Sequence, residues 1–155
     1  MCFVCGLDND FGLQASFYET AGNELIAIFH PSEKHQGYPG RLHGGIASTI
    51  LDETIGRAIC AGKEDQVWGV TVEFKIKYRK PIPLDREIKV FTRITKEEGR
   101  FFHGTGEILL ANGEVAVSAE GKYMRIPLDK ITDTEFIETG WRIVEDANDP
   151  REIEL

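Results

Sequence analysis

The 155-residue sequence contains little cysteine and no long apolar run. Its three cysteines cannot all pair within one chain, so a disulfide framework is not expected. A membrane-spanning helix needs about 20 consecutive apolar residues, and no run approaches that length, so no membrane partner is expected. The first residues lack a basic segment followed by an apolar one, so an export signal is not expected either. Together these absences predict a reduced, cytoplasmic setting.

Basic residues are outnumbered, with 18 Lys and Arg against 26 Asp and Glu and a net charge of −8. Nucleic-acid binding needs a broad basic face, so no nucleic-acid partner is expected. The length fits one domain that buries a core, which we place at residues 1–130. Residues 131–155 are expected to form a C-terminal extension outside the chemistry, packed on the domain or trailing from it. Its candidate anchors are its larger apolar residues, Phe136, Ile137, Trp141 and Ile143.

Residues 43–60 carry apolar side chains at helical spacing, which predicts one long buried helix. Gly44 and Gly45 are expected just before its first turn, where backbone N–H groups have no acceptor within the helix. The apolar stripe consists of Ala47, Ile50, Leu51, Thr54, Ile55, Ala58 and Ile59.

Three charged residues interrupt this helix. Glu53 and Arg57 are four positions apart and can form an ion pair on the helix surface. Asp52 has no basic residue three or four positions away, and an unpartnered carboxylate on a buried helix is costly unless it is used. Ser48 and Gly56, one turn to either side, would leave room for a ligand. Asp52 is therefore the candidate general base or nucleophile, with a buried structural acid as the alternative.

Six segments have the alternation of β-strands, at residues 13–19, 24–30, 68–80, 87–96, 101–111 and 114–124. In the third, Val70, Val72, Phe74, Ile76 and Tyr78 are expected to share one packed face. The glycines at 104 and 106 indicate a bulge or a close contact inside the fifth strand. The predicted fold is α+β, with a six-stranded antiparallel sheet wrapped around one long central helix.

A Cys-x-x-Cys pair, Cys2 and Cys5, opens the sequence. A zinc site needs about four ligands, and no second cysteine pair is present. A redox motif would need a thioredoxin-like strand–helix setting, which the pattern lacks. Neither a metal nor a cofactor is therefore expected.

The order of elements and several motifs resemble those of the hotdog-fold acyl-CoA thioesterases. The branch most resembled is that of the phenylacetate pathway and thioesterase superfamily member four. The resemblance covers about residues 2–126 and is specific in its combination of His-Gly-Gly, an acid nine residues after the histidine, and six strands. The matching motifs are Cys-Gly at 5–6 with Asn9 and Gly-Leu at 12–13, Leu-His-Gly-Gly at 42–45 with Asp52, Val-Thr-Val-Glu at 70–73, and Tyr-Arg-Lys-Pro-Ile-Pro at 78–83.

This resemblance implies hydrolysis of acyl-CoA thioesters by a homodimer or homotetramer, with active sites at the dimer interface. The backbone amides of Gly44 and Gly45 would bind the thioester oxygen, as the helix dipole also favours; the glycines could equally serve a tight turn. His43 would orient the loop or the thioester, or else simply pack. Thr71 matches a hydroxyl that helps to hold the attacking water. Its place in the alternation, off the face of Val70, requires a bulge or an interface location.

Coenzyme A carries phosphates, and basic residues gather around residues 75–80. Arg79 and Lys80 at the end of one strand, and Arg100 at the end of another, are the candidate CoA-binding residues. Lys75 and Lys77 are explained equally well as the solvated face of a strand. Many relatives carry an asparagine six residues before the histidine. That position is Gly37 here, so Gln36 is the candidate substitute.

The sequence leaves two other functions open. The first is a non-catalytic hotdog protein that binds acyl-CoA; regulators of this kind usually append a DNA-binding segment, and the sequence has no helix-turn-helix. The second is a hotdog dehydratase or hydratase, which needs a histidine and an acid arranged for proton abstraction beside a carbonyl. The His-Gly-Gly motif with its acid nine residues on does not match that arrangement.

Overall fold

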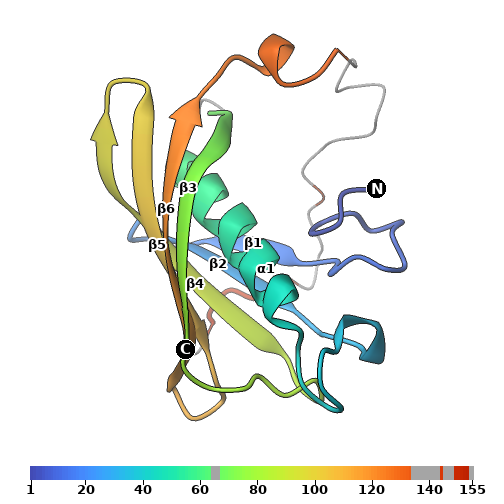
Figure 1. The fold of residues 1–155 in the computed structure, drawn as a ribbon. Coiled ribbons are helices and arrows are strands. Elements are labelled where there is room, and N and C mark those ends of the chain that lie inside the picture. Colours follow the sequence, from blue (N-terminus) through green and yellow to red (C-terminus); the bar gives the residue numbers. More distant parts are fainter. Residues whose placement is uncertain (64–66, 134–143, 145–148, 154–155) are drawn as a thin grey trace.

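In the computed structural model, which describes residues 1–63, 67–133, 144 and 149–153, one helix lies across a curved antiparallel sheet (Figure 1). The helix α1 spans Gly44–Arg57 and continues as one 3-10 turn, η2 (Ala58–Cys60). The six strands have the spatial order β1-β2-β4-β5-β6-β3, and all neighbours are antiparallel. The predicted fold class is confirmed. The strands are β1 (Ser16–Glu19), β2 (Leu25–Phe29), β3 (Gly69–Tyr78), β4 (Ile88–Glu98), β5 (Phe101–Leu109) and β6 (Val115–Arg125).

The predicted boundaries differ from the observed ones chiefly at β1, which begins three residues late. The preceding stretch pairs instead with the N-terminal loop, since the amide of Leu13 donates to Phe3 O at 2.8 Å and that of Ala15 to Val4 O at 2.9 Å. A short 3-10 helix, η1 (Glu33–His35), lies between β2 and α1, and another, η3 (Leu128–Lys130), follows β6.

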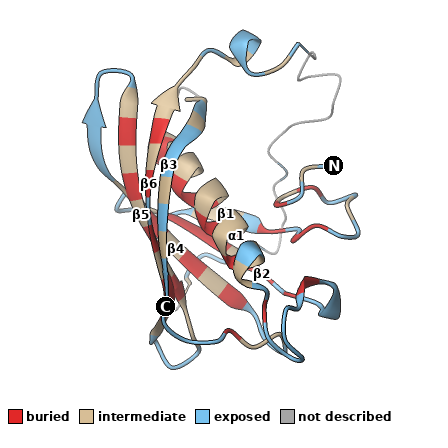
Figure 2. Cartoon of the chain, in the orientation of Figure 1, coloured by how far each residue is buried: buried red, intermediate tan, exposed pale blue. Residues whose placement is uncertain are grey.

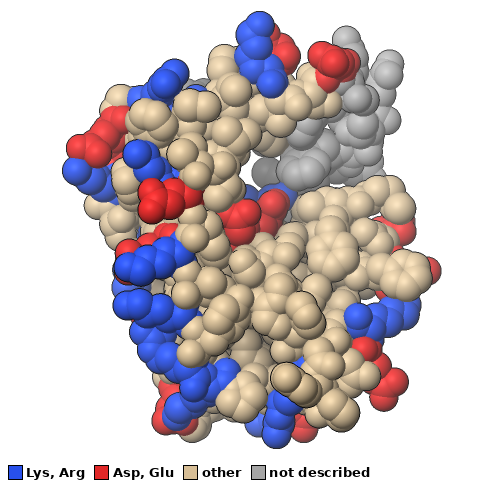
Figure 3. Space-filling view, in the orientation of Figure 1, with Lys and Arg blue, Asp and Glu red and all other residues tan. Residues whose placement is uncertain are grey.

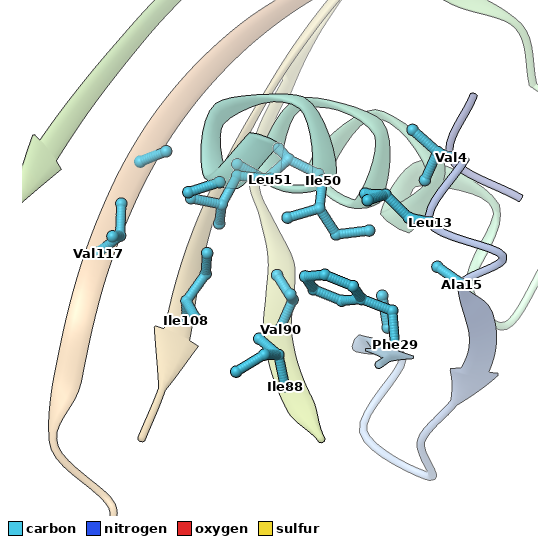
Figure 4. Close-up of a cluster of buried hydrophobic side chains, with 14 of the residues drawn as sticks. Val4, Leu13, Ala15, Phe29, Ile50, Leu51, Ile88, Val90, Ile108 and Val117 are labelled. Carbon is cyan, nitrogen blue, oxygen red and sulfur yellow. The ribbon is translucent and has the colours of Figure 1, made fainter. Parts of the chain in front are cut away.

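The core lies between α1 and the concave face of the sheet, and all seven residues of the predicted helical stripe are buried (Figure 2). Ile50 and Leu51 point from the helix towards Phe29, Val90 and Ile108 on the strands (Figure 4).

The helix approaches the sheet closely over the two glycines of β5, and this confirms the predicted close contact. A Cβ at Gly104 would stand 2.6 Å from Ile55 Cγ2, and one at Gly106 would stand 2.8 Å from Thr92 Cγ2. A side chain at either position would have to push buried neighbours aside.

Strand β3 contains a β-bulge, which changes the predicted face of its first residues. Thr71 pairs with Tyr123 on β6, but the next pair is Glu73 with Lys122, so Val72 is the extra residue. The prediction that Val70 shares a face with Phe74 is therefore wrong: the bulge reverses the alternation and puts Thr71 on the helix side. Val72 is left 52% exposed.

Strands β1 and β3 form the two edges of the sheet. In the described part of the chain, no helix combines the length and apolar character needed to cross a bilayer. The four candidate anchors of the extension, Phe136, Ile137, Trp141 and Ile143, lie outside the described residues, and the domain boundary at residue 130 stays a prediction.

Candidate active site

The carboxylate of Asp52 projects from the third turn of α1 towards β3 and β6 and is half-buried. Its Oδ1 accepts two hydroxyl hydrogen bonds, from Thr71 Oγ1 at 2.9 Å and from Tyr123 OH at 3.1 Å. Tyr123 OH also lies 3.0 Å from the backbone oxygen of Asp52. Among the described residues nothing bonds to Oδ2. One carboxylate oxygen is thus held in place, and the other is available for chemistry.

Tyr123 is a site residue that was not predicted from the sequence. Its ring is 2% exposed and stacks on Phe102, with centroids 5.1 Å apart. Burial first, and then the adjacent Asp52 charge, raises the pKa of Tyr123, so the phenol keeps its proton and donates. The sequence pattern that could have indicated its burial is the alternation along β6, which puts Tyr123 on the same face as the buried Ala119.

The space beside Asp52 that Gly56 leaves is occupied by this tyrosine. A Cβ at Gly56 would lie 3.2 Å from Tyr123 Cε1, and one at Gly121 would lie 2.5 Å from Cε2 of the same ring. The expectation of ligand room at Gly56 is therefore wrong. The glycines make space for the hydrogen-bonding ring instead.

At the start of α1, His43 is the N-cap. Its Nδ1 accepts the amide of Gly45 at 2.9 Å, and its backbone oxygen accepts that of Ile46 at 3.0 Å. The amide of Gly44 has no acceptor among the described residues, while Gly44 O accepts Tyr78 OH at 2.9 Å. Of the two predicted oxyanion donors, Gly44 offers a free N–H, and Gly45 uses its own within the cap.

The acid and the amides are not brought together within one chain. Asp52 lies eight positions beyond Gly44, which is about 12 Å along a helix that rises 1.5 Å per residue. A single thioester carbonyl cannot contact both.

The neighbouring carboxylate, Glu53, has the partner predicted for it. Arg57 Nε donates to Glu53 Oε1 at 2.7 Å, and the guanidinium also covers the ring of Phe17 at 4.6 Å. Ligating atoms of metal-binding side chains gather at one place in the described residues, where Cys2, Cys5 and Glu53 come within 4.8 Å of one another.

The predicted CoA-binding residues are exposed but lie at two ends of the sheet. Arg79 donates to Ser118 Oγ at 2.6 Å, and Lys80 pairs with Glu114. Arg100 lies in the β4–β5 turn, over the ring of Phe101. Tyr78 pairs with Val117 near the start of β6 whereas Phe101 pairs with Met124 near its end, so the two groups do not meet in one chain. Figure 3 shows Lys and Arg side chains gathered along one side of the molecule, over the lower half of β3.

Gln36 has a role within its loop. Its Oε1 accepts the amide of Gly40 at 3.2 Å, and its backbone forms a β-bridge with Leu42. At Gly37 a Cβ would stand 3.1 Å from His43 Cδ2. An asparagine in this position would press on the residue that caps the helix.

A six-stranded antiparallel sheet curved around one central helix, with a hydroxyl-held carboxylate on that helix, defines a hotdog-fold protein. The family model of the thioesterase superfamily matches residues 39–117, about half of the chain, and this match includes Asp52 and Thr71 but not Tyr123. The chain belongs to the thioesterase superfamily.

Individual relatives agree with this membership. Acyl-coenzyme A thioesterase THEM4 of Rattus norvegicus is 37% identical over 99 residues, which are 63% of this chain and 41% of that protein. The match therefore spans less than half of that relative. A crystallised thioesterase superfamily protein is 27% identical, with a TM-score of 0.64 over 71% of this chain and 55% of its own. The E. coli PaaI protein of the phenylacetic acid degradation operon has a TM-score of 0.66 at 13% identity, over 74% and 81% of the two chains, and shares the fold.

The geometry predicts that Tyr123→Phe destabilises the fold. The change removes the hydroxyl that bonds Asp52 and leaves the packing of the ring intact, so the free energy of unfolding should fall by about 1–2 kcal/mol. Urea denaturation measures it. Tyr18→Phe is the matched control, because Tyr18 OH donates to Asp149 at 3.3 Å in an exposed position, and its loss should cost under about 0.5 kcal/mol. Equal losses in the two variants would contradict the assigned role of Tyr123.

Proposed function

We propose that this protein hydrolyses acyl-CoA thioesters to the free acid and coenzyme A. The observation that carries the proposal is the Asp52 carboxylate, oriented by two hydroxyl donors on Oδ1 and open at Oδ2. Membership of the thioesterase superfamily and the likeness to a protein named acyl-coenzyme A thioesterase supply the substrate class.

The open oxygen of Asp52 suits either of two routes. As a general base, Oδ2 takes a proton from water while the water oxygen attacks the thioester carbon. As a nucleophile, Oδ2 attacks that carbon itself and forms an anhydride, which water then opens. In both routes the C–S bond breaks, the thiolate of coenzyme A leaves, and one water is consumed. Thr71 and Tyr123 fix the direction in which Oδ2 points.

The oxyanion that forms on the thioester needs a donor, and the Gly44 amide at the positive end of the helix dipole is suited to it. The distance of about 12 Å along α1 requires that this amide come from a second copy of the chain. Strand β3, ten residues long and at the edge of the sheet, offers an unpaired edge for such a copy. A homodimer, alone or within a homotetramer, would therefore hold two sites, each with an acid from one copy and an amide from the other.

The role of Asp52 predicts the effect of Asp52→Asn on hydrolysis. The variant keeps the shape and removes the basicity, so kcat/KM should fall on the order of 10²–10⁴-fold. The assay is hydrolysis of short, long and aromatic acyl-CoAs, after circular dichroism has confirmed folding. Asp85→Asn, an exposed residue paired with Arg86, is the control and should keep wild-type activity. Undiminished hydrolysis by Asp52→Asn would refute the assignment. Binding without hydrolysis by the wild type would establish the non-catalytic alternative.

The role of the Gly44 amide can be tested by removing its hydrogen. Gly44 is the first helical residue, where proline fits, and His43 already has the extended backbone (φ −66°, ψ 137°) that precedes proline. Gly44→Pro should lower kcat by about 10²–10³-fold. Gly44→Ala, whose Cβ would make an ordinary 3.4 Å contact with Tyr78, keeps the N–H and should keep most of the activity.

Co-expression then separates one-chain from two-chain sites. If the donor and the acid come from different copies, mixed dimers of Gly44→Pro and Asp52→Asn chains contain one intact site and recover activity that neither variant has alone. Absence of recovery in confirmed mixed dimers would place both groups in one chain. A stable monomer in light scattering at micromolar concentration would contradict the shared site.

Arg79 and Lys80 are proposed to contact the nucleotide end of coenzyme A, since both are exposed and can turn from their present partners to a phosphate. One hydrogen bond to a charged group contributes about 1.5–3 kcal/mol, so changing both residues to alanine should raise KM for acyl-CoA by about tenfold or more. A pantetheine thioester, which lacks the nucleotide, should be little affected. Lys96→Ala, at another exposed ion-paired lysine, is the control. Equal effects on both substrates would rule out a phosphate contact.

A further inference from the structure

We propose that Cys2, Cys5 and Glu53 form a binding site for a zinc-like divalent cation, which ties the N-terminal loop to helix α1. The two sulfur atoms and a carboxylate oxygen lie within 4.8 Å of one another, and all three residues are half-buried. Two thiolates with one carboxylate are ligands that Zn²⁺ accepts, with a water in the fourth position. The hydrolysis proposed above uses none of these groups.

The loop at residues 2–6 already has a shape that presents both sulfurs to one point. The amide of Gly6 donates to Cys2 O at 3.0 Å, which closes the turn, and the amide of Val4 donates to Cys2 Sγ at 3.3 Å. A Cβ at Gly6 would stand 2.5 Å from Cys2 O, so glycine permits this closure. The Val4 amide directed at the Cys2 sulfur would support a metal-bound thiolate, as outer partners of metal ligands generally do.

Arg57 organises the other half of the site. Its Nη2 donates to Cys5 Sγ at 3.2 Å, and its Nε donates to Glu53 Oε1 at 2.7 Å. Because a carboxylate accepts at both oxygens, Glu53 can keep Arg57 on Oε1 and offer Oε2 to a metal. A divalent cation with two thiolates is neutral, and so is the Glu53–Arg57 pair. Metal binding therefore adds no net charge to a half-buried cluster.

A redox role for the two cysteines fits the structure less well. A redox pair of this spacing belongs to a thioredoxin-like strand–helix setting, whereas Cys2 and Cys5 lie in a loop before the first strand. A disulfide would also leave unexplained why a helix carboxylate is held beside both sulfurs. The geometry therefore favours a ligand set over a thiol switch.

The proposed site would reinforce a loop that already packs on the core. Val4 is buried in the hydrophobic cluster, and the Phe3 and Val4 carbonyls bond the chain just before β1. A metal shared with Glu53 would fasten this loop to α1 one position from Asp52. Sequence spacing could not reveal the site, because the third ligand lies 48 residues from the second.

The test uses the full chain, reduced, depleted of metal by a chelator and titrated with Co²⁺ without oxygen. We expect a sulfur-to-cobalt charge-transfer absorption that saturates at one equivalent and disappears when Zn²⁺ is added. Cys60→Ser is the matched control, because the Cys60 sulfur lies apart, next to the Val67 amide, and this variant should bind as the wild type does. No saturable absorption in the wild type, or its loss in Cys60→Ser, would overturn the proposal.

Single ligand variants locate the site. Cys2→Ser and Cys5→Ser should lose most of the absorption, and Glu53→Gln should raise the dissociation constant at least about tenfold, while Glu120→Gln on the exposed face should not. If the cysteine variants do not fold, alkylation of the wild type followed by mass spectrometry decides. Zn²⁺ should then protect Cys2 and Cys5 but not Cys60. Equal protection of all three cysteines, or of none, would refute the site.

Discussion

A carboxylate that is half-buried on a core helix has to be hydrogen-bonded, and the two strands facing Asp52 are built around that requirement. On β3 the bulge at Val72 turns Thr71 towards the helix without turning Phe74, Ile76 and Tyr78 away from it. On β6 a large ring reaches the same oxygen from a buried position, and the glycines at 56 and 121 leave space for it. Without the bulge, the Thr71 hydroxyl would lie on the outer face of the sheet.

The groups proposed for the chemistry lie two turns apart on the helix. At its start, His43 caps the helix and takes one of the two glycine amides, which leaves the Gly44 amide without an acceptor among the described residues. Two turns later the acid stands with one free oxygen. The straight helix keeps these groups apart, so the proposed reaction centre would be assembled from two copies.

The sequence predicted the helix and all six strands because their periodicities are local. The seven residues of the apolar stripe, which runs through α1 into η2, were all predicted correctly to be buried, because a spacing of 3.6 residues is sustained over 13 positions. Alternation alone did not reveal the bulge, because the residue types from Val70 to Tyr78 alternate as if nothing interrupted them. The resemblance at Thr71 required either a bulge there or an interface location, and the structure has the bulge. The tyrosine on β6, the third ligand beside Cys5 and the separation of Arg79 from Arg100 depend on contacts between distant parts of the chain. No local pattern records such contacts.

The rigid connection between Gly44 and Asp52 has a mechanical consequence for an assembly of the proposed kind. Each α1 then belongs to two reaction centres, with its first amide in one and its carboxylate in the other. In such an assembly the two centres share a common pair of helices, so a shift of one helix on substrate binding would move a group of each centre.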